Sequence, residues 1–162
     1  MTEKVIILRG TSGSGKTTWA KRAKRDKLQG VTSIVSADNY FYQVAGDDES
    51  EYDFDPNRLQ EAHDLCFGKF MRRLRDGLDN VIVDNTNMTL GEVNPYRMVA
   101  RFADAAITVV EFRCPPEIAA RRSDHLPDDN KAALEVVERQ LEKYEELPSY
   151  FEADTHGVDT SP

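Results

Sequence analysis

Near the N-terminus, residues 10–17 read GTSGSGKT, a spacing of glycine, lysine and hydroxyl side chains that can bind a phosphate group. The segment matches the pattern G-x-x-x-x-G-K-[ST] at every fixed position. Its glycines permit a tight turn in which successive backbone N–H groups point toward one anion. The ammonium group of Lys16 can reach the β- and γ-phosphates, and the hydroxyl of Thr17 can ligate Mg²⁺. The segment therefore predicts a site for a nucleoside triphosphate and Mg²⁺.

The chain on either side of this loop fits the same interpretation. Residues 5–8 are the apolar run VIIL, typical of a buried strand, and residues 18–23 are typical of the start of a helix. Phosphate loops require a strand before them and a helix after them, so a glycine-rich turn that matches by chance is disfavoured. The residues predicted to contact the nucleotide are Ser12, Gly13, Ser14, Gly15, Lys16, Thr17 and Thr18.

Acidic and amide side chains follow two other apolar runs. Asp38 comes after residues 32–37, and Asp84 and Asn87 follow residues 81–83. Parallel sheets bind ligands beyond the carboxyl ends of their strands. These side chains are therefore expected to converge on the phosphate loop.

Each of these side chains has a catalytic and a structural interpretation. Phosphoryl transfer needs an acceptor hydroxyl held in line and a group that receives its proton. Asp38 is the candidate base, and the alternative is that it caps the turn that follows. Asp84 would hold Mg²⁺ or its waters, or it supports the phosphate loop through hydrogen bonds. Asn87 would contact the acceptor substrate or the loop, and the sequence leaves both open.

A lid is predicted from an arginine pair followed by a polar stretch. Arg121 and Arg122 stand directly before residues 123–130. Such a segment can close over a triphosphate and deliver a guanidinium that offsets the charge of the transition state. Neighbouring residues face different sides of a helix, so one arginine is expected to do this, and Arg122 is preferred; the alternative is a surface ion pair with the acidic last helix. His125 lies within the predicted lid, a position from which it could touch the nucleotide.

Apolar runs alternate with helical patterns along the whole chain. This alternation predicts an α/β protein with the P-loop NTPase fold: a parallel sheet, helices on both of its faces, and a helical lid. A single kinase domain is expected over residues 1–150, followed by an acidic, frayed tail at 151–162. The predicted strands are 4–9, 32–37, 81–83 and 107–112, and the predicted helices are 16–27, 56–76 (with Asp55 as N-cap), 90–103, 116–122 and 131–146.

The composition fits one domain without stabilising disulfides. The chain has 162 residues, a net charge of −8 and two cysteines, Cys66 and Cys114, without metal-ligand spacing. The acidic balance argues against strong nonspecific binding of duplex nucleic acid, although a strand end could still enter a small opening lined by basic residues. No apolar run has the length of a membrane span, and a cytoplasmic protein without a membrane partner is the expectation.

Six short motifs follow one another along the chain: GTSGSGKT at 10–17, SADNYF at 36–41, YDFDP at 52–56, EAH at 61–63, VIVDNTN at 81–87 and ARRS at 120–123. In this order they resemble the polynucleotide-kinase-type P-loop kinases, a family that includes phage 5′-hydroxyl polynucleotide kinases and phage 5-hydroxymethyluracil DNA kinases. The resemblance covers about residues 4–147. It implies that Asp38 is the general base, that Lys16 and Thr17 serve the phosphates and Mg²⁺, and that Arg122 is the lid arginine.

Three features depart from the family pattern. Phe41 stands where the phage polynucleotide kinase has an arginine that contacts the acceptor strand, and Ser123 stands in place of the usual asparagine. A second lid arginine is missing, with His125 and Leu126 in that region. These departures leave kinase chemistry intact but weaken the expectation of a 5′-hydroxyl acceptor.

The leading functional hypothesis is an ATP-dependent kinase that phosphorylates a hydroxyl of a nucleic acid, most simply at a 5′ end. A second hypothesis is a kinase for hydroxymethylated pyrimidines within phage DNA, whose flipped base could stack on Tyr40, Phe41 or Tyr42. A third is a small-molecule kinase, which the acidic charge favours slightly. The fourth, a non-catalytic ATP-binding module, is disfavoured because a protein that only binds ATP needs no base such as Asp38.

Overall fold

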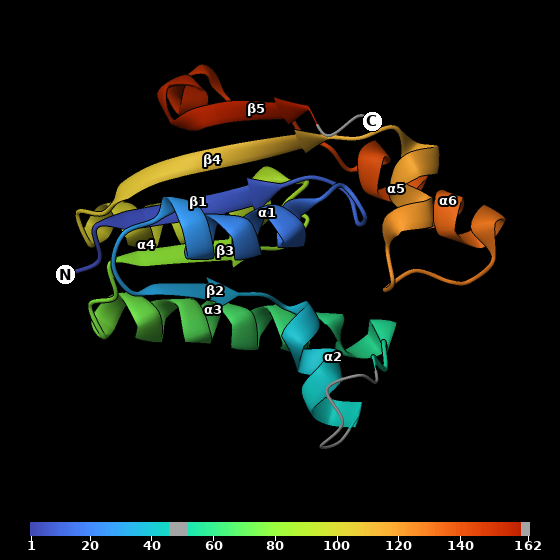
Figure 1. Cartoon of the computed structure of the whole chain (residues 1–162), viewed down its shortest axis with the longest axis horizontal. Helices are drawn as coiled ribbons and strands as arrows, with labels where there is room; N and C mark the ends of the chain where they lie inside the picture. The colour runs from blue at the N-terminus through green and yellow to red at the C-terminus, as the bar shows by residue number, and fades with distance from the viewer. Residues whose placement is uncertain (46–51, 160–162) are drawn as a thin grey trace.

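The computed structural model describes residues 1–45 and 52–159, and its centre is a five-stranded parallel sheet (Figure 1). The strand order is β2-β3-β1-β4-β5. β1 (Lys4–Arg9) lies in the middle, between β3 (Asn80–Asp84) and β4 (Ala106–Arg113), and β2 (Thr32–Val35) and β5 (Thr155–Asp159) form the edges. The α/β class and the parallel sheet are confirmed.

Both faces of the central strands are buried, which explains their continuous apolar sequences. Successive residues of a strand point to opposite faces of the sheet. In β1, Val5 and Ile7 belong to one apolar cluster, whereas Ile6 and Leu8 belong to a second cluster. The first strand thus lies between two cores, and the loop that follows it starts from a rigid base.

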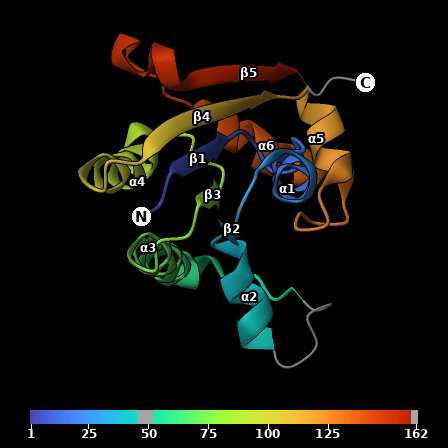
Figure 2. The ribbon, with the colours of Figure 1, turned by 60° about the vertical axis from the view of Figure 1, so that its left-hand side comes forward.

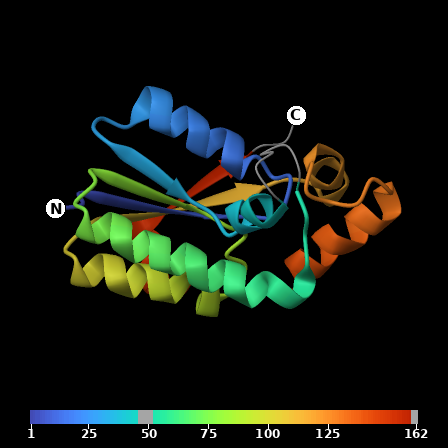
Figure 3. The same cartoon turned by 90° about the horizontal axis from the view of Figure 1, so that it is seen from below.

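Helices cover both faces of the sheet (Figures 2 and 3). α1 (Lys16–Arg22) and the π-helical turn Ala23–Lys27 lie on one face, and α3 (Leu59–Arg75) and α4 (Leu90–Phe102) lie on the other. This arrangement is the one that the alternating pattern predicts. In the part of the chain that the structure describes, no helix has both the length and the apolar character needed to cross a membrane.

The starts of the two helices on the second face follow from local side-chain chemistry. The carboxylate of Asp55 accepts a hydrogen bond from the backbone N–H of Asn57 (2.9 Å) at the start of the 3₁₀ turn Pro56–Arg58, which leads into α3. Thr89 and Glu92 form a reciprocal capping box at the start of α4. The predicted role of Asp55 as an N-cap is confirmed.

The predicted lid is a helix pair beyond the carboxyl ends of the strands. α5 (Pro116–Arg122) and α6 (Asn130–Glu142) are joined by residues 123–129 and pack through small side chains. The side chains buried between them are Ala119, Ala120, Ala133 and Val137. Figure 1 shows the pair at the edge of the molecule toward which β1 and β4 point.

One helix was not expected from the sequence. α2 (Asp38–Ala45) begins directly after β2, and it places Tyr40 and Phe41 in the core beneath it. β2 is two residues shorter than predicted, because the backbone N–H of Ala37 turns away to donate to the side-chain oxygen of Asn85 (2.8 Å). The acidic loop of residues 46–51 lies outside the described residues.

The expected frayed tail is wrong for residues 151–159. A 3₁₀ segment, Ser149–Asp154, leads into β5, which pairs in parallel with β4. The side chain of Phe151 is fully buried in the same cluster as Val5 and Ile7. Pairing with β4 and burial of Phe151 hold this segment on the sheet despite its polar composition.

Candidate active site

The phosphate loop joins β1 to α1 and is shaped by two glycines in the left-handed region. Gly13 has φ +74°, and a Cβ atom at this position would lie 1.9 Å from the carbonyl oxygen of Ala119 in α5. Gly15 has φ +99° and is the N-cap of α1. The loop is therefore in direct contact with the base of the lid, and a side chain at residue 13 would push the two apart.

Lys16 is a buried cation at the start of α1. Its side chain is nearly inaccessible to water, and its Nζ atom donates to the carbonyl oxygen of Thr11 (2.6 Å). Burial lowers the pKa of Lys16 to about 8, although the charges of Asp84 and Asp38 oppose this shift. The charges of both carboxylates therefore act on the same ammonium group.

Thr17 and Asp84 form the pair of oxygen ligands that the sequence predicts for Mg²⁺. The hydroxyl of Thr17 donates to Oδ2 of Asp84 (2.7 Å), and Asp84 is buried at the carboxyl end of β3. Burial raises the pKa of Asp84, while the bond from Thr17 and the charge of Lys16 act against it. Hydroxyl and carboxylate oxygens suit Mg²⁺. The same bond supports the loop, which is the structural role that the sequence offered for Asp84, and the Mg²⁺ role stays a prediction.

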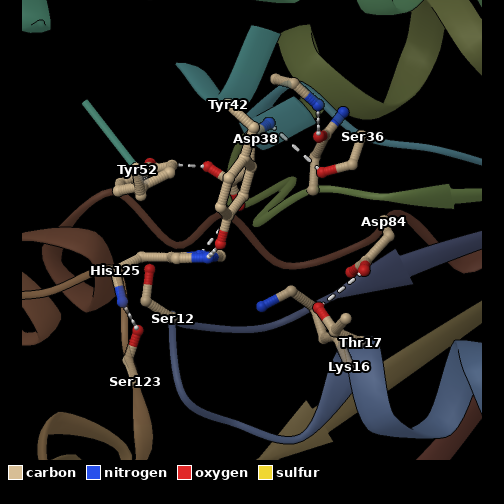
Figure 4. Close-up of polar contacts among 12 residues, drawn as sticks. Ser12, Lys16, Thr17, Ser36, Asp38, Tyr42, Tyr52, Asp84, Ser123 and His125 are labelled. Carbon is tan, nitrogen blue, oxygen red and sulfur yellow. Dashed lines mark hydrogen bonds and ion pairs between the residues drawn. The ribbon is translucent and has the colours of Figure 1, made fainter. Parts of the chain in front are cut away.

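Asp38 begins α2 on the opposite side of the site from Lys16 and Thr17 (Figure 4). Its Oδ1 atom accepts from the hydroxyl of Tyr52 (3.0 Å), and its side chain is 49% exposed. Burial acts to raise the pKa of Asp38, but the contacts with His125 and Tyr52 and the charge of Lys16 outweigh it, and the pKa lies below its ordinary value. Asp38 is therefore an ionised carboxylate that solvent can still reach.

His125 reaches Asp38 from the lid. Its Nδ1 atom lies 3.6 Å from Oδ2 of Asp38, and its Nε2 atom lies 2.6 Å from the hydroxyl oxygen of Tyr42 in α2 (Figure 4). Its ring stacks on that of Tyr52, with centroids 4.3 Å apart and an angle of 21°. The contact with Asp38 raises the pKa of His125, although burial opposes the shift. The sequence placed His125 in the lid but did not indicate these partners.

Two predicted acceptor contacts are replaced by structural roles. Tyr40 is 6% exposed, and the guanidinium of Arg58 lies over its ring at 5.0 Å. Asn87 is buried with φ +49°, and its side-chain amide donates to the carbonyl oxygen of Leu8 (2.7 Å). Tyr40 therefore fills the core below α2, and Asn87 supports the end of β1 rather than a substrate.

Of the loop residues predicted to contact the nucleotide, Ser12 is bonded to α6, whereas Thr18 is exposed. The backbone N–H of Ser12 donates to the side-chain oxygen of Gln140 in α6 (2.8 Å), and the amide of Gln140 donates to the hydroxyl of Ser12 (3.0 Å). Thr18 is exposed on the first turn of α1. α6 thus holds the first half of the loop through Gln140, a residue that no motif in the sequence singled out.

Arg122, the predicted lid arginine, lies at the end of α5. Arg122 is exposed, and its guanidinium is 4.0 Å from the sulfur of Cys114. This contact places the guanidinium near the carboxyl end of β4, because Cys114 directly follows that strand. The preference for Arg122 over Arg121 stays a prediction.

A buried arginine under the loop was missed by the sequence reasoning. Arg9 is 1% exposed and donates to the carbonyl oxygens of Asn87 (2.8 Å) and Met88 (2.7 Å). It also pairs with Glu111 (2.8 Å), and Tyr144 lies 4.4 Å from its guanidinium. The signal was present in the sequence, because a charged residue ends an otherwise apolar strand just before Gly10. Arg9 thus connects β1 to the segment after β3 and to β4, directly before the phosphate loop.

The fold and the loop define a kinase-like P-loop domain. A family model described as "AAA domain" matches residues 5–147, and the chain belongs to this family. NEDD4-binding protein 2 of Homo sapiens is 30% identical over 149 residues, which is 90% of this chain. The match covers only 8% of the human protein, so it concerns one segment of a much longer chain.

Solved structures share the same architecture. A chain in the structure of the Pnkp1/Rnl/Hen1 complex is 26% identical, with a TM-score of 0.57 over 79% of this chain and 42% of that one. A second structure of that assembly, described as an RNA repair complex, gives a TM-score of 0.58 at 19% identity over 87% of this chain and 44% of that one. A gluconokinase from Sinorhizobium meliloti 1021 gives 0.62 at 18% identity over 96% and 82%. These likenesses confirm the P-loop NTPase fold, and they leave the acceptor open.

Proposed function

We propose that this domain is an ATP-dependent kinase that transfers the γ-phosphate to a hydroxyl of a nucleic acid, most simply at a 5′ end. The observation that carries the proposal is the position of Asp38, a half-exposed carboxylate that faces the phosphate loop across from Lys16. A protein that only binds ATP has no use for an accessible base there. The likeness to chains of an RNA repair complex supports a nucleic-acid acceptor.

The roles in the reaction follow from the chemistry of each group. A bond forms between the acceptor oxygen and the γ-phosphorus, the bond from that phosphorus to the β–γ bridging oxygen breaks, and ADP leaves. The acceptor proton passes to Asp38. Lys16 and the loop amides balance the phosphate charge, and Arg122 is the candidate for the lid guanidinium. When bound, Mg²⁺ would be held through Thr17 and Asp84 and would neutralise charge on the phosphates.

A small-molecule kinase is the second candidate. The fold likeness to a gluconokinase and the net charge of −8 favour it over a polyanionic acceptor. The modified-base hypothesis keeps one of its three stacking partners: Tyr40 and Phe41 are 6% and 1% exposed and cannot stack on a flipped base without unpacking the core, whereas Tyr42 is partly exposed.

An acceptor panel tests the proposal. The protein is incubated with γ-labelled ATP and Mg²⁺ and with 5′-hydroxyl DNA, 5′-hydroxyl RNA, DNA containing 5-hydroxymethyluracil, nucleosides and gluconate. We expect the wild-type protein to label strand ends. The negative control, Asp38→Asn, should give much less label. Label on gluconate or nucleosides alone would support the second candidate, and ATP binding without label on any acceptor would overturn the kinase proposal.

A further inference from the structure

The lid and the acceptor side of the site are joined by one histidine. His125 belongs to the connection between α5 and α6, yet each polar partner of its ring lies elsewhere: Asp38 and Tyr42 in α2, and Tyr52 as a stacking partner in the segment before α3. Its side chain is 30% exposed. Tyr52 thus contacts one face of the ring, while Asp38 and Tyr42 contact its two nitrogens, and all three are distant from His125 in sequence (Figure 4).

The partners of the ring determine where its protons lie. An ionised Asp38 can only accept, so the ring state that suits this pair has its proton on Nδ1, 3.6 Å from Oδ2. Nε2 then either accepts from the hydroxyl of Tyr42, if the ring is neutral, or donates to it, if the ring is charged. In both states Nδ1 has no free lone pair. His125 therefore cannot take the acceptor's proton from Asp38, and it can only orient the carboxylate and stabilise its charge.

The carboxylate of Asp38 keeps room for a substrate while it is held. Tyr52 donates to Oδ1, and Nδ1–H of His125 faces Oδ2. Each carboxylate oxygen can accept a second hydrogen bond. Because the side chain of Asp38 is 49% exposed, an incoming hydroxyl can approach it without displacing the histidine.

We propose that His125 is a positioning residue of the lid, which Tyr42 and Tyr52 seat so that its Nδ1–H holds Asp38 in the orientation that receives the acceptor proton. The proposal rests on the proposed kinase function for its catalytic consequence. It also gives the lid a second role, because a residue of the α5–α6 connection then orients the carboxylate on the acceptor side of the site.

The contact itself is tested without any assay of activity. The ionisation of His125 is followed by NMR in the whole chain and in Asp38→Asn. The groups that act on the ring are Asp38, Tyr42, Tyr52, Asp84 and Asp124. We expect the pKa of His125 to fall in the variant, while the ring chemical shifts of His63, in α3, stay the same at a fixed pH. An unchanged pKa of His125 would overturn the contact, whether or not the protein proves to be a kinase.

The consequence for catalysis is tested with the acceptor identified by the panel. His125→Ala should lower kcat about 10- to 100-fold with the KM for ATP within about twofold, as expected when a reacting group is misplaced. His125→Asn keeps an N–H donor and should recover part of the loss, and Lys131→Ala, on the exposed start of α6, should have no effect. An unchanged or raised kcat in His125→Ala, or an asparagine variant no better than alanine, would overturn the positioning role. If the wild-type protein phosphorylates no acceptor, the proposed function fails and the NMR result alone decides the contact.

Discussion

At the scale of single residues, the ammonium group of Lys16 is a cation in a position almost closed to water. Its pKa of about 8 in the free protein means that it is charged below pH 8 and largely neutral above it. Triphosphate oxygens favour the charged form, so ATP binding should raise this pKa. We therefore expect ATP binding to take up almost one proton at pH 9 and almost none at pH 6.5, with affinity falling about tenfold per pH unit above pH 8.

Calorimetry in two buffers of different ionisation enthalpy measures this proton uptake directly. Lys21→Ala is the matched control, because Lys21 is exposed on the same helix. That variant should take up the same number of protons as the wild type. Binding at pH 9 without proton uptake would show that Lys16 stays charged in the free protein.

The carboxylate of Asp38 gives the second prediction at this scale. Asp38→Asn keeps the size of the side chain but removes the base, and it should lower kcat by about 10²- to 10⁴-fold. The Kd for ATP should change little, since Lys16 and the loop remain. Asp64→Asn, on the exposed face of α3, is the control and should behave as wild type. A loss of ATP affinity with turnover intact would reassign Asp38 to the nucleotide.

At the scale of elements, the phosphate loop depends on its close approach to α5. Gly13→Ala would place a Cβ atom 1.9 Å from a backbone oxygen of Ala119, at a φ of +74° that disfavours any side chain. We expect a large loss of ATP affinity together with a lower Tm. The control is Gly68→Ala in α3, where a Cβ atom meets no atom within 4 Å. That change should raise stability by about 0.5–1 kcal/mol, because alanine is the better helix former.

Urea unfolding and ATP titration of both variants separate the two effects. If Gly13→Ala bound ATP normally, the contact between loop and lid would have no part in shaping the nucleotide site. If Gly68→Ala were equally damaging, the loss in Gly13→Ala could not be assigned to the loop.

The elements differ in how well their sequences predict them, for physical reasons. β1 and β3 are buried on both faces, so their apolar runs are unmistakable, and Asp55 with Pro56 marks the approach to α3. α2 was missed because its sequence, DNYFYQVA, is rich in aromatic residues that prefer strands. Its helix is stabilised by packing of Phe41 into the core, which no local pattern encodes.

The candidate site shows the same division. Lys16, Thr17, Asp38 and Asp84 could be predicted, since a loop motif and the ends of parallel strands place them. The contacts of His125 with Asp38 and Tyr42 could not, because they join segments distant in the chain and depend on how the lid folds back. For Asn87 the sequence left the acceptor and the loop open, and for Tyr40 it suggested a substrate contact; the burial of both side chains, which no local pattern encodes, favours structural roles.

At the scale of the whole molecule, the C-terminal segment belongs to the domain rather than to a tail. β5 extends the sheet beyond β4, and Phe151 is fully buried in the principal core. The guanidinium of Arg97, in α4, lies 4.4 Å from the ring of Phe151. Residues up to 159 therefore cover one edge of the sheet, and the domain extends past the limit of 150 that the sequence indicated.

Replacement of the buried ring tests this domain limit. Phe151→Ala removes a fully buried aromatic side chain and should lower the free energy of unfolding by about 3–5 kcal/mol, measured by urea denaturation. Its neighbour Tyr150 is 59% exposed, and Tyr150→Ala should cost about 1 kcal/mol or less. Because both residues adjoin Arg97, loss of a contact with that guanidinium alone would affect them similarly, whereas loss of core packing affects only Phe151. Equal and small effects would mean that the segment after residue 150 contributes nothing to folding, and that the sheet is complete at β4.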